Sequence, residues 1–375
     1  MIVGVVKEAV PGERRVAVVP KTVPLLKKAG MDVVIEPGAG ALAGFSDSEY
    51  QAAGAEMVAR ADVFTRAEII AAVRVIAGAD GSGIAPCTGK VIVGLADPLT
   101  KGGTIPLMAE RQALLFALEL LPRITRAQSM DVLSSQATVA GYKAVLLAAG
   151  ALGKMMPMMT TAAGTLAPAK VLVLGAGVAG LQAIATARRL GAVVSGYDVR
   201  PAAREQISSL GAKPVVLALE NAEGQGGYAK QMDEAYYAEQ RNQLAAVIRE
   251  QDIVITTAAV PGARSPILIT ADAVRGMATG SVIVDLAAER GGNCELTRAG
   301  ETVDVGGVRV MGPLNLASEV PNHASQMYSK NVSAFLGAIV KKGALAIDTT
   351  DEVVRDTLVT QAGRIVNERV AKVQS

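Results

Sequence analysis

The 375-residue chain is poor in the side chains on which much catalysis and metal binding depend: it has one histidine, two cysteines and no tryptophan. A single imidazole excludes histidine-rich zinc sites, and it excludes a conventional Ser–His–Asp hydrolase unless His323 itself is the base. Cys87 and Cys294 lie far apart, and neither has metal-ligand spacing around it. Reduced thiols in a cytoplasmic setting are the simpler interpretation, while the sequence leaves a disulfide open.

An excess of charge is also missing, because the formal net charge is +2 and acidic and basic residues are interspersed. Without a basic stripe, we expect no nucleic-acid binding. We expect no signal peptide, since the first residues form a strand-like run. The uncharged residues 171–187 are interrupted by three glycines and a glutamine, which favours a strand, turn and helix over a membrane span. We therefore expect a soluble chain.

Aliphatic residues and glycine are abundant, with 50% hydrophobic residues and 39 glycines. Short β-branched runs alternate with longer segments rich in Ala and Leu, which is typical of parallel sheets covered by helices. The sequence thus predicts an α/β fold with two Rossmann-like domains built on parallel sheets. The predicted strands are residues 2–6, 32–36, 91–95, 114–118, 171–174, 193–197, 253–257, 282–286 and 308–311, and the predicted helices include 20–30 and 322–343.

The domain organisation follows from one break in the pattern. Residues 153–170 contain two prolines and two internal glycines, which predicts a hinge that interrupts regular structure. We assign residues 1–130 plus 320–375 to a first domain that the C-terminal helices complete. Residues 131–319 form the second domain, with a linking helix.

The strongest motif is Gly175-x-Gly177-x-x-Gly180, which directly follows a predicted strand and opens a predicted helix. Gly175 permits the tight turn, Gly177 lets the backbone approach a pyrophosphate, and Gly180 permits close helix–strand packing. The N-terminus of the helix offers free N–H groups and a positive dipole end to phosphates. With the next strand ending at Asp198, the whole context predicts dinucleotide binding.

Asp198 favours NAD(H) over NADP(H), because its carboxylate accepts hydrogen bonds from ribose hydroxyls and repels a 2′-phosphate. Arg200 and Arg204 weaken this inference slightly, since arginine is the side chain that a 2′-phosphate recruits. Two later loops, residues 255–262 and 284–293, follow strands at the edge where ligands bind. They flank the ribose and nicotinamide in one interpretation and are ordinary tight connections in the other.

Residues 221–240 hold three of the seven tyrosines after Gly224, Gly226 and Gly227. A glycine-rich polar loop of this kind can close over a cofactor and exclude water, with Tyr228 as the contact. A surface loop that leads into an amphipathic helix is the equally good alternative.

The stretch LPRITRAQSMDVLSSQ, residues 121–136, concentrates polar side chains between two aliphatic segments. Thr125 and Gln128 have capping-box spacing, so a helix is predicted to begin near Thr125. Its continuation places Gln128, Asp131 and Ser135 on one face, with Arg123 and Arg126 close enough to keep Asp131 ionised. The face either caps the helix and meets solvent or presents hydrogen-bonding groups to a carboxamide.

The residues PRITRAQSMDVLSSQ, GAGVAGLQAIATARRLGA, GGYAK and DLAAERGGNC together resemble the NAD(H)-binding component of proton-translocating nicotinamide nucleotide transhydrogenase. The resemblance extends over essentially the whole chain, including KEAVPGERRVAVVP at the N-terminus. It implies a hydride-transferring oxidoreductase subunit that binds NAD(H) in the cleft between its two domains. By the resemblance, Arg123, Gln128, Asp131 and Ser134 hold the nicotinamide end, and Gln128 lies nearest the second nucleotide.

The remaining site residues are also assigned by the resemblance. Those that cradle the pyrophosphate, contact the ribose or belong to the cofactor loops are Gly175, Gly177, Val178, Gly180, Asp198, Arg200, Tyr228, Ala258 and Glu289. Direct hydride transfer between two nicotinamide rings needs proximity and exclusion of water. It needs no general acid, so a chain with one histidine is compatible with it.

The resemblance further implies partners. The chain has one dinucleotide fingerprint, so NADP(H) is expected on a partner component and proton translocation on a membrane-embedded one. The family component is a dimer, so a homodimer is expected, peripheral on the cytoplasmic face of a bacterial inner membrane.

The N-terminal motif and the fingerprint also resemble those of alanine dehydrogenases. Amino-acid dehydrogenation is therefore the alternative function. Arg15 matches their motif arginine, and Glu289 matches an acidic residue after a later strand. The region around residues 91–100 lacks the histidine that they use, so handling of imine and amine protons is disfavoured. A third alternative, from another class, is a non-catalytic NAD-binding redox sensor.

Overall fold

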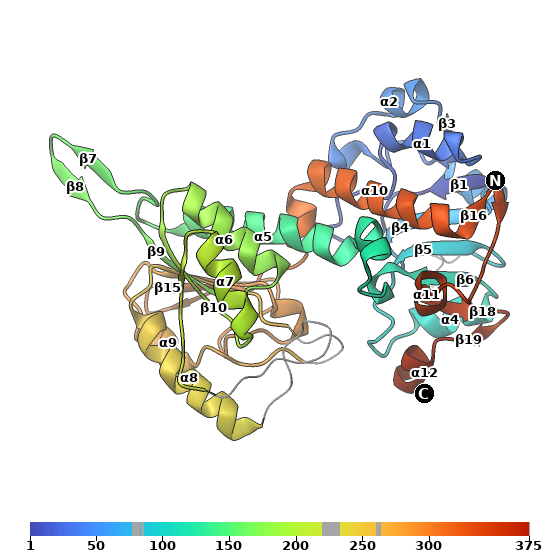
Figure 1. Cartoon of the computed structure of the whole chain (residues 1–375). Coiled ribbons are helices and arrows are strands. Elements are labelled where there is room, and N and C mark those ends of the chain that lie inside the picture. Colours follow the sequence, from blue (N-terminus) through green and yellow to red (C-terminus); the bar gives the residue numbers. More distant parts are fainter. Residues whose placement is uncertain (77–82, 84–85, 220–232, 260–263, 375) are drawn as a thin grey trace. The chain divides into compact units, whose positions relative to one another are not determined.

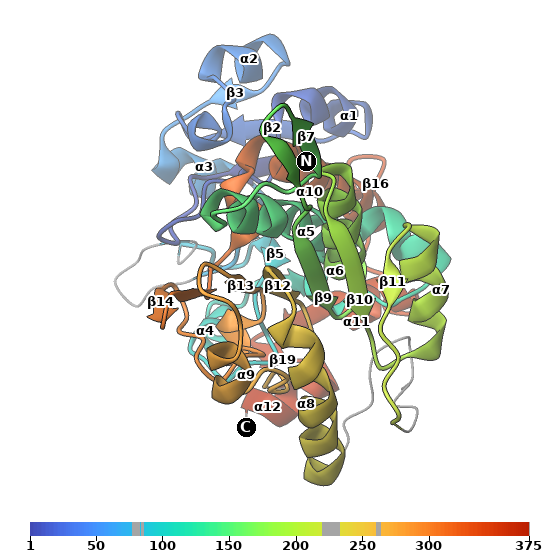
Figure 2. The ribbon, with the colours of Figure 1, turned by 90° about the vertical axis from the view of Figure 1, so that its left-hand side faces the viewer.

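The computed structural model describes residues 1–76, 83, 86–219, 233–259 and 264–374. Its contacts divide the chain into two compact units, which are described separately: unit 1 is Met1–Gln136 with Ala317–Ser375, and unit 2 is Ala137–Leu316. Figures 1 and 2 show the ribbon in two views. Both buried cysteines carry free thiols, Cys87 in unit 1 and Cys294 in unit 2, which settles the disulfide question left open by the sequence.

Unit 1 is built on an eight-stranded sheet in the order β19-β18-β6-β5-β4-β1-β2-β3. The strands from β1 to β6 are parallel, whereas β18 runs antiparallel to both β6 and β19. Its strands are β1 (Ile2–Val5), β2 (Asp32–Ile35), β3 (Glu56–Met57), β4 (Ile69–Arg74), β5 (Val91–Leu95), β6 (Leu114–Ala117), β18 (Leu358–Gln361) and β19 (Arg364–Ile365). A small antiparallel pair, β16 (Val340–Lys341) and β17 (Ala344–Leu345), lies outside this sheet.

Helices cover both faces of this sheet because successive strand residues point to opposite sides. On β4, Ile69 and Val73 pack on α10 (Pro321–Ile339), while Ile70 packs on α3 (Arg60–Arg66) and α4 (Thr104–Glu110). The other helices of unit 1 are α1 (Val23–Lys28), α2 (Asp47–Ala52), α11 (Glu352–Thr357) and α12 (Glu368–Gln374). A 3-10 segment, η4 (Thr125–Met130), precedes α5 (Val132–Ala151), which passes from unit 1 into unit 2.

Unit 2 has a seven-stranded sheet in the order β11-β10-β9-β12-β13-β15-β14, parallel except for β14. The order reverses between β9 and β12, which is the switch point at which such sheets bind ligands. Its strands are β9 (Lys170–Leu174), β10 (Val193–Tyr197), β11 (Lys213–Pro214), β12 (Ile253–Thr256), β13 (Val282–Asp285), β14 (Thr302–Val305) and β15 (Val308–Met311).

The two faces of the unit 2 sheet also carry different helices. One face packs on α5, α6 (Val178–Arg189) and α7 (Pro201–Ser209), and the other on α8 (Glu234–Arg249) and α9 (Ala271–Arg275). Within the described ranges, α5 is the one helix long and apolar enough to span a membrane. Its residues Ala144, Val145 and Ala148 are fully buried in the unit 2 core, as in a core helix of a globular unit.

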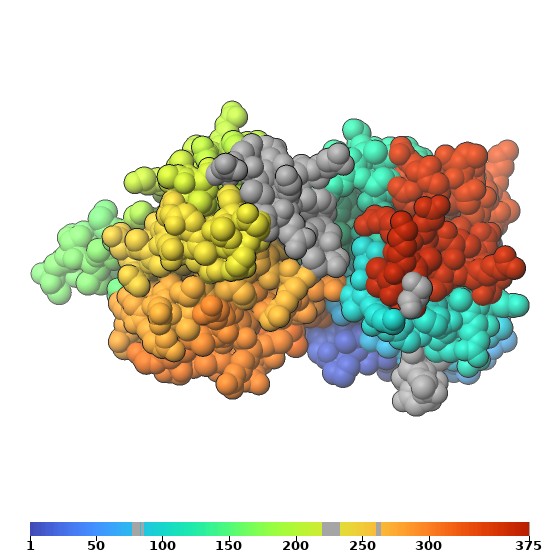
Figure 3. All heavy atoms as spheres, turned by 90° about the horizontal axis from the view of Figure 1, so that it is seen from below, coloured from blue at the N-terminus to red at the C-terminus, as the bar shows by residue number. Residues whose placement is uncertain are grey.

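The structure confirms the predicted α/β class, and each of the nine predicted strands occurs within one residue of its expected bounds. The expected break at residues 153–170 is wrong in one respect, because it contains the hairpin of β7 (Met159–Thr161) and β8 (Gly164–Leu166). This hairpin extends away from the body of unit 2 (Figures 1 and 3). Its strands lie outside both large sheets, so no hydrophobic face indicated them in the sequence.

Candidate functional site

The glycine turn after β9 has three glycines with three different constraints. Gly175 has a φ of +94°, and a Cβ there would lie 2.6 Å from Thr257 Oγ1. A Cβ on Gly180 would lie 1.8 Å from the Gly175 carbonyl oxygen, so α6 reaches this turn only with glycine. A Cβ on Gly177 would meet nothing within 4 Å, which leaves the N-terminus of α6 open from that side. Val178, the first residue of α6, is 44% exposed.

Asp198, just beyond the carboxyl end of β10, accepts four hydrogen bonds from its own unit. Its Oδ1 accepts from Arg200 N and Nε at 2.9 and 2.8 Å, and its Oδ2 accepts from Ala176 N and Arg200 Nη2 at 2.8 and 2.9 Å. Burial opposes ionisation of Asp198, but the hydrogen bonds from Arg200 and Ala176 outweigh it and hold the pKa below its usual value. Arg200 is therefore paired with Asp198 and does not stand apart as a 2′-phosphate ligand.

A hollow lies beside Asp198 in unit 2, lined by Tyr197, Val199, Pro201, Arg204, Leu217, Leu219 and Tyr236 as well. Among the described residues, the buried Nε of Arg204 has no hydrogen-bond partner. The hollow thus combines an aromatic and aliphatic lining with a carboxylate and an unused N–H donor. Such a mixture suits one end of a nucleoside.

The loops after β12 and β13 are tied together by Asn293. Its Oδ1 accepts from Ala258 N at 3.1 Å, and its Nδ2 donates to Ala258 O at 2.8 Å. Thr257 Oγ1 in turn donates to Gly175 O at 3.0 Å, so the β12 loop also contacts the glycine turn. These contacts join the start of the first loop to Asn293 in the second within unit 2, and residues 260–263 of the first loop lie outside the described residues.

Asp285, the last residue of β13, is the organiser that sequence reasoning missed. Its fully buried carboxylate accepts hydrogen bonds from five donors, namely Thr256 Oγ1, Ala287 N, Asn293 N, Cys294 N and Thr297 Oγ1. A carboxylate that ends a buried β-branched strand was the available signal. Glu289 in the same loop is exposed, and its Oε1 accepts from Asn315 N at 2.8 Å.

In unit 1, the helix predicted from Thr125 does not form as one element. Residues Thr125–Met130 form a 3-10 segment whose N-cap, Ile124, has no side-chain cap. Asp131 has an extended ψ of 92° and starts α5 instead, since its carboxylate accepts from Ser134 N at 2.9 Å and Ser134 Oγ at 2.6 Å. The predicted capping box is wrong, because an aspartate before Val132 caps the long helix better than Thr125 does.

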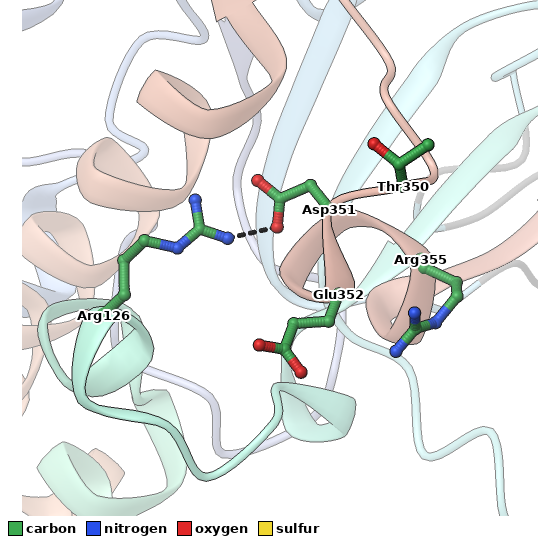
Figure 4. A pocket seen from close by; sticks show the side chains of 5 residues that line it. All are labelled: Arg126, Thr350, Asp351, Glu352 and Arg355. Carbon is green, nitrogen blue, oxygen red and sulfur yellow. Dashed lines mark hydrogen bonds and ion pairs between the residues drawn. The ribbon is translucent and has the colours of Figure 1, made fainter.

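The expectation for Arg126 is also wrong. Its guanidinium forms an ion pair with Asp351, just before α11, rather than lying against Asp131 (Figure 4). Thr350, Glu352 and Arg355 complete the lining of an open hollow of about 530 Å³ at this ion pair. Its walls carry charges of both signs, so the hollow selects neither an anion nor a cation.

The other predicted residues of this stretch face outward. Arg123 and Gln128 are exposed, whereas Ala127 and Met130 on either side of Gln128 are buried. The single histidine, His323, is exposed in the first turn of α10. Tyr228, with the glycines before it, lies outside the described residues.

Two part-buried acids at the carboxyl edge of the unit 1 sheet have raised pKa values. Burial raises the pKa of Glu8 to about 7, although the hydrogen bonds that Glu8 accepts from the N–H groups of Val73 and Arg74 lower it. Burial likewise raises the pKa of Glu119 to about 7, and its buried Oε2 has no hydrogen-bond partner among the described residues. Neither acid was predicted from the sequence.

Comparison with known proteins identifies the family. The "Alanine dehydrogenase/PNT, N-terminal domain" model matches residues 4–140, and the "Alanine dehydrogenase/PNT, C-terminal domain" model matches residues 144–368. The chain belongs to the alanine dehydrogenase/PNT family.

Within the alanine dehydrogenase/PNT family the chain is homologous to an oxidoreductase subunit. It is 44% identical to an NAD(P) transhydrogenase alpha-subunit chain of Rickettsia prowazekii, over 96% of this chain and 95% of that one. The transhydrogenase structure from Sinorhizobium meliloti superposes with a TM-score of 0.89 at 48% identity, covering 98% of this chain and all of that one. An L-alanine dehydrogenase structure is more distant, with a TM-score of 0.82 at 26% identity and coverage of 100% and 99%.

The residues of unit 2 fit the dinucleotide that the sequence motif of this alanine dehydrogenase/PNT chain predicts. The open side of Gly177 offers room for a phosphate beside the first N–H groups of α6. Asp198 and the unused Nε of Arg204 lie at one hollow, next to that turn. A donor, an acceptor and an apolar wall are the groups that an adenosine moiety requires.

Proposed function

We propose that the chain is the NAD(H)-binding component of a transhydrogenase and takes part in direct hydride transfer to NADP(H) held on a partner component. The observation that carries the proposal is the glycine turn after β9. A Cβ on Gly175 or Gly180 would clash with neighbouring atoms, whereas the space beside Gly177 is open. The homology to a transhydrogenase alpha subunit supports the same reaction.

NADH bound at this site supplies a hydride, which leaves C4 of the dihydronicotinamide with both bonding electrons and joins C4 of the oxidised nicotinamide of NADP⁺. The products are NAD⁺ and NADPH, and the step needs no proton donor. The chain's task is to bind and orient the ring and to exclude water. Exposed amide and hydroxyl groups are sufficient for this, and the sole histidine lies exposed on α10.

The roles within unit 2 are divided between backbone and side chains. The backbone at Gly175, Gly177, Val178 and Gly180 holds the pyrophosphate. Asp198 accepts hydrogen bonds from the adenosine ribose, and Arg200 orients its carboxylate. Ala258 and Glu289 lie in the two loops that border the nicotinamide half, and Tyr228 contacts the cofactor from its glycine-rich loop.

The unit 1 residues orient the carboxamide. Gln128 offers both a donor and an acceptor from an exposed position, while Ala127 and Met130 of the same segment are buried. Arg123, Asp131 and Ser134 hold the nicotinamide end with it. Since Asp131 and Ser134 are hydrogen-bonded to each other, they act as one unit.

Amino-acid dehydrogenation is disfavoured by the state of Arg15. Its Nε and Nη2 donate to the carboxylate of Glu13 at 2.7 and 2.6 Å, and its Nη1 donates to Gln136 Oε1 at 2.8 Å. A guanidinium held at all three nitrogens is not poised to bind the carboxylate of a 2-oxo acid.

The partners follow from the same proposal. The chain works with an NADP(H)-binding component and a membrane-embedded proton-translocating component, docked on the cytoplasmic face of a bacterial inner membrane.

The projecting hairpin is a suitable contact surface for a homodimer, because its apolar side chains are exposed. Met158, Met159 and Leu166 are 65%, 37% and 53% exposed. Leu166→Asp is expected to shift the mass measured by light scattering from dimer to monomer. A wild-type monomer at micromolar concentration contradicts the dimer.

Reconstitution tests the function. The purified chain should bind NADH far more tightly than NADPH and should catalyse little alone. Mixed with a homologous NADP(H)-binding component, it should reduce an NAD analogue with electrons from NADPH. Tight NADH binding without any transfer in that mixture would falsify the proposal, and NADH oxidation by pyruvate and ammonia would replace it with alanine dehydrogenation. Gln128→Asn should slow transfer strongly while NADH affinity changes little.

A further inference from the structure

The turn that carries Gln128 is held from its buried side by one residue of α10. Asn331 is 7% exposed, and its Nδ2 donates to Ser129 O at 2.8 Å. Its Oδ1 accepts from Ser135 Oγ at 2.7 Å. The two partners lie on either side of Asp131, so a single carboxamide bridges the joint between η4 and α5.

Other contacts at this turn are weaker or less specific. Ala127 and Met130 pack into the core of unit 1, but apolar packing leaves rotation of the backbone undetermined. The Arg126–Asp351 ion pair is exposed to solvent, since the Arg126 side chain is 53% exposed (Figure 4). Exposed ion pairs contribute little and are screened by salt. The hydrogen bonds of Asn331 therefore add a directional restraint that ties this turn to α10.

We propose that Asn331 is a positioning residue for hydride transfer, which sets the orientation of the Gln128 carboxamide through Ser129 and Ser135. The inference rests on the proposed role of Gln128. Because Asn331 uses both its donor and its acceptor on this joint, its loss releases one restraint on the Ser129 carbonyl, next to Gln128, and one on the Ser135 side chain at the start of α5. A displacement of about 1 Å in an orienting group can cost about 100-fold in rate.

The test uses Asn331→Leu, which keeps the branching at Cγ, is somewhat larger, and removes both hydrogen bonds. Single-turnover hydride transfer in the reconstituted mixture is expected to slow by at least about tenfold. The dissociation constant for NADH of the full chain is expected to stay within about twofold, since the nucleotide fingerprint lies in unit 2. A structural defect alone gives no such split between transfer rate and NADH affinity.

Ser329→Ala is the matched control on the same helix. Ser329 is fully buried, and its hydroxyl bonds Thr22 Oγ1 at 2.8 Å and Val19 N at 3.1 Å, away from the Gln128 turn. We expect both variants to lower the urea midpoint and only Asn331→Leu to slow transfer. If Asn331→Leu does not fold, Ser135→Ala removes one of the two bonds and is expected to slow transfer by a smaller factor. Equal transfer rates in Ser135→Ala and wild type, or equal slowing in the Ser329 control, overturn the inference.

A double-mutant cycle shows whether Asn331 acts through Gln128. The Gln128→Asn/Asn331→Leu variant is expected to transfer hydride no more slowly than Gln128→Asn, because the orientation of an already displaced carboxamide no longer matters. Multiplicative slowing overturns the inference while leaving the proposed function intact. Normal transfer in Gln128→Asn sinks the role of Gln128 itself, which is a separate outcome.

Discussion

The guanidinium of Arg200 grips both carboxylate oxygens of Asp198, with Nε 2.8 Å from Oδ1 and Nη2 2.9 Å from Oδ2. The acid that would repel a 2′-phosphate and the base that would attract one thus neutralise each other. Selectivity between the two dinucleotides therefore depends on the pair and not on Asp198 alone.

Breaking this pair is expected to change nucleotide preference. In Asp198→Ser, the Arg200 guanidinium is released toward a 2′-phosphate, and a charge-assisted hydrogen bond contributes about 1.5–3 kcal/mol. We expect NADPH affinity to rise about tenfold or more and NADH affinity to fall, both measured by calorimetric titration. Adding Arg200→Gln should abolish the gain. Unchanged NADPH binding in the single variant contradicts the role of the pair.

The glycine turn allows two alanine substitutions with opposite consequences. Gly177→Ala should fold with an unchanged melting temperature, because its Cβ meets nothing within 4 Å. It should bind NADH at least about tenfold more weakly, since a methyl group then faces the pyrophosphate. Gly180→Ala should lower the melting temperature, because its Cβ would lie 1.8 Å from the Gly175 carbonyl oxygen. Equal stability losses in the two variants would argue against this division of roles.

Two part-buried acids of unit 1, Glu8 and Glu119, should make stability depend on pH. Glu8 and Glu119 have a folded-state pKa of about 7 against the ordinary value of 4.5. The folded state therefore keeps protons that the unfolded state loses, so the unfolding free energy falls as pH rises from about 4.5 to about 7 and levels off above. The fall is up to about 3 kcal/mol for each carboxyl.

Glu119→Gln removes its share of that slope in urea denaturation curves recorded across this pH window. Glu110→Gln, at the exposed end of α4, is the matched control and should leave the slope as it is. A slope that is the same in wild type and Glu119→Gln means that Glu119 is ionised in the folded state throughout.

Asp131 caps the N-terminus of α5, and its contribution to stability can be measured separately from hydride transfer. Asp131→Ala should lower the unfolding free energy by about 1 kcal/mol, because Ser134 N loses its acceptor. Asp131→Asn keeps a capping oxygen and should recover most of that loss. If denaturation gives the Asn and Ala variants the same stability, the cap does not act as described.

The sequence by itself determined the features whose cause is local. The nine expected strands occur because short β-branched runs between turn residues indicate strands in any packing. The glycine fingerprint was equally readable, since a strand, three spaced glycines and a helix are contiguous. The central strand β4 (Ile69–Arg74) was missed, because two alanines weaken its β-propensity and only burial on both faces stabilises it.

Tertiary structure alone decided which partner each polar group took. Thr125 and Asp131 were both able to start a helix, and Asn331 of α10, 202 residues beyond Ser129, bridges the joint where η4 ends and α5 begins. Arg126 pairs with Asp351, which is 225 residues away in the sequence, and not with the nearby Asp131. Asp285 accepts from the end of β12 and from the segment after β13 for the same reason: a buried polar group must be satisfied, and only packing determines which distant groups come within reach.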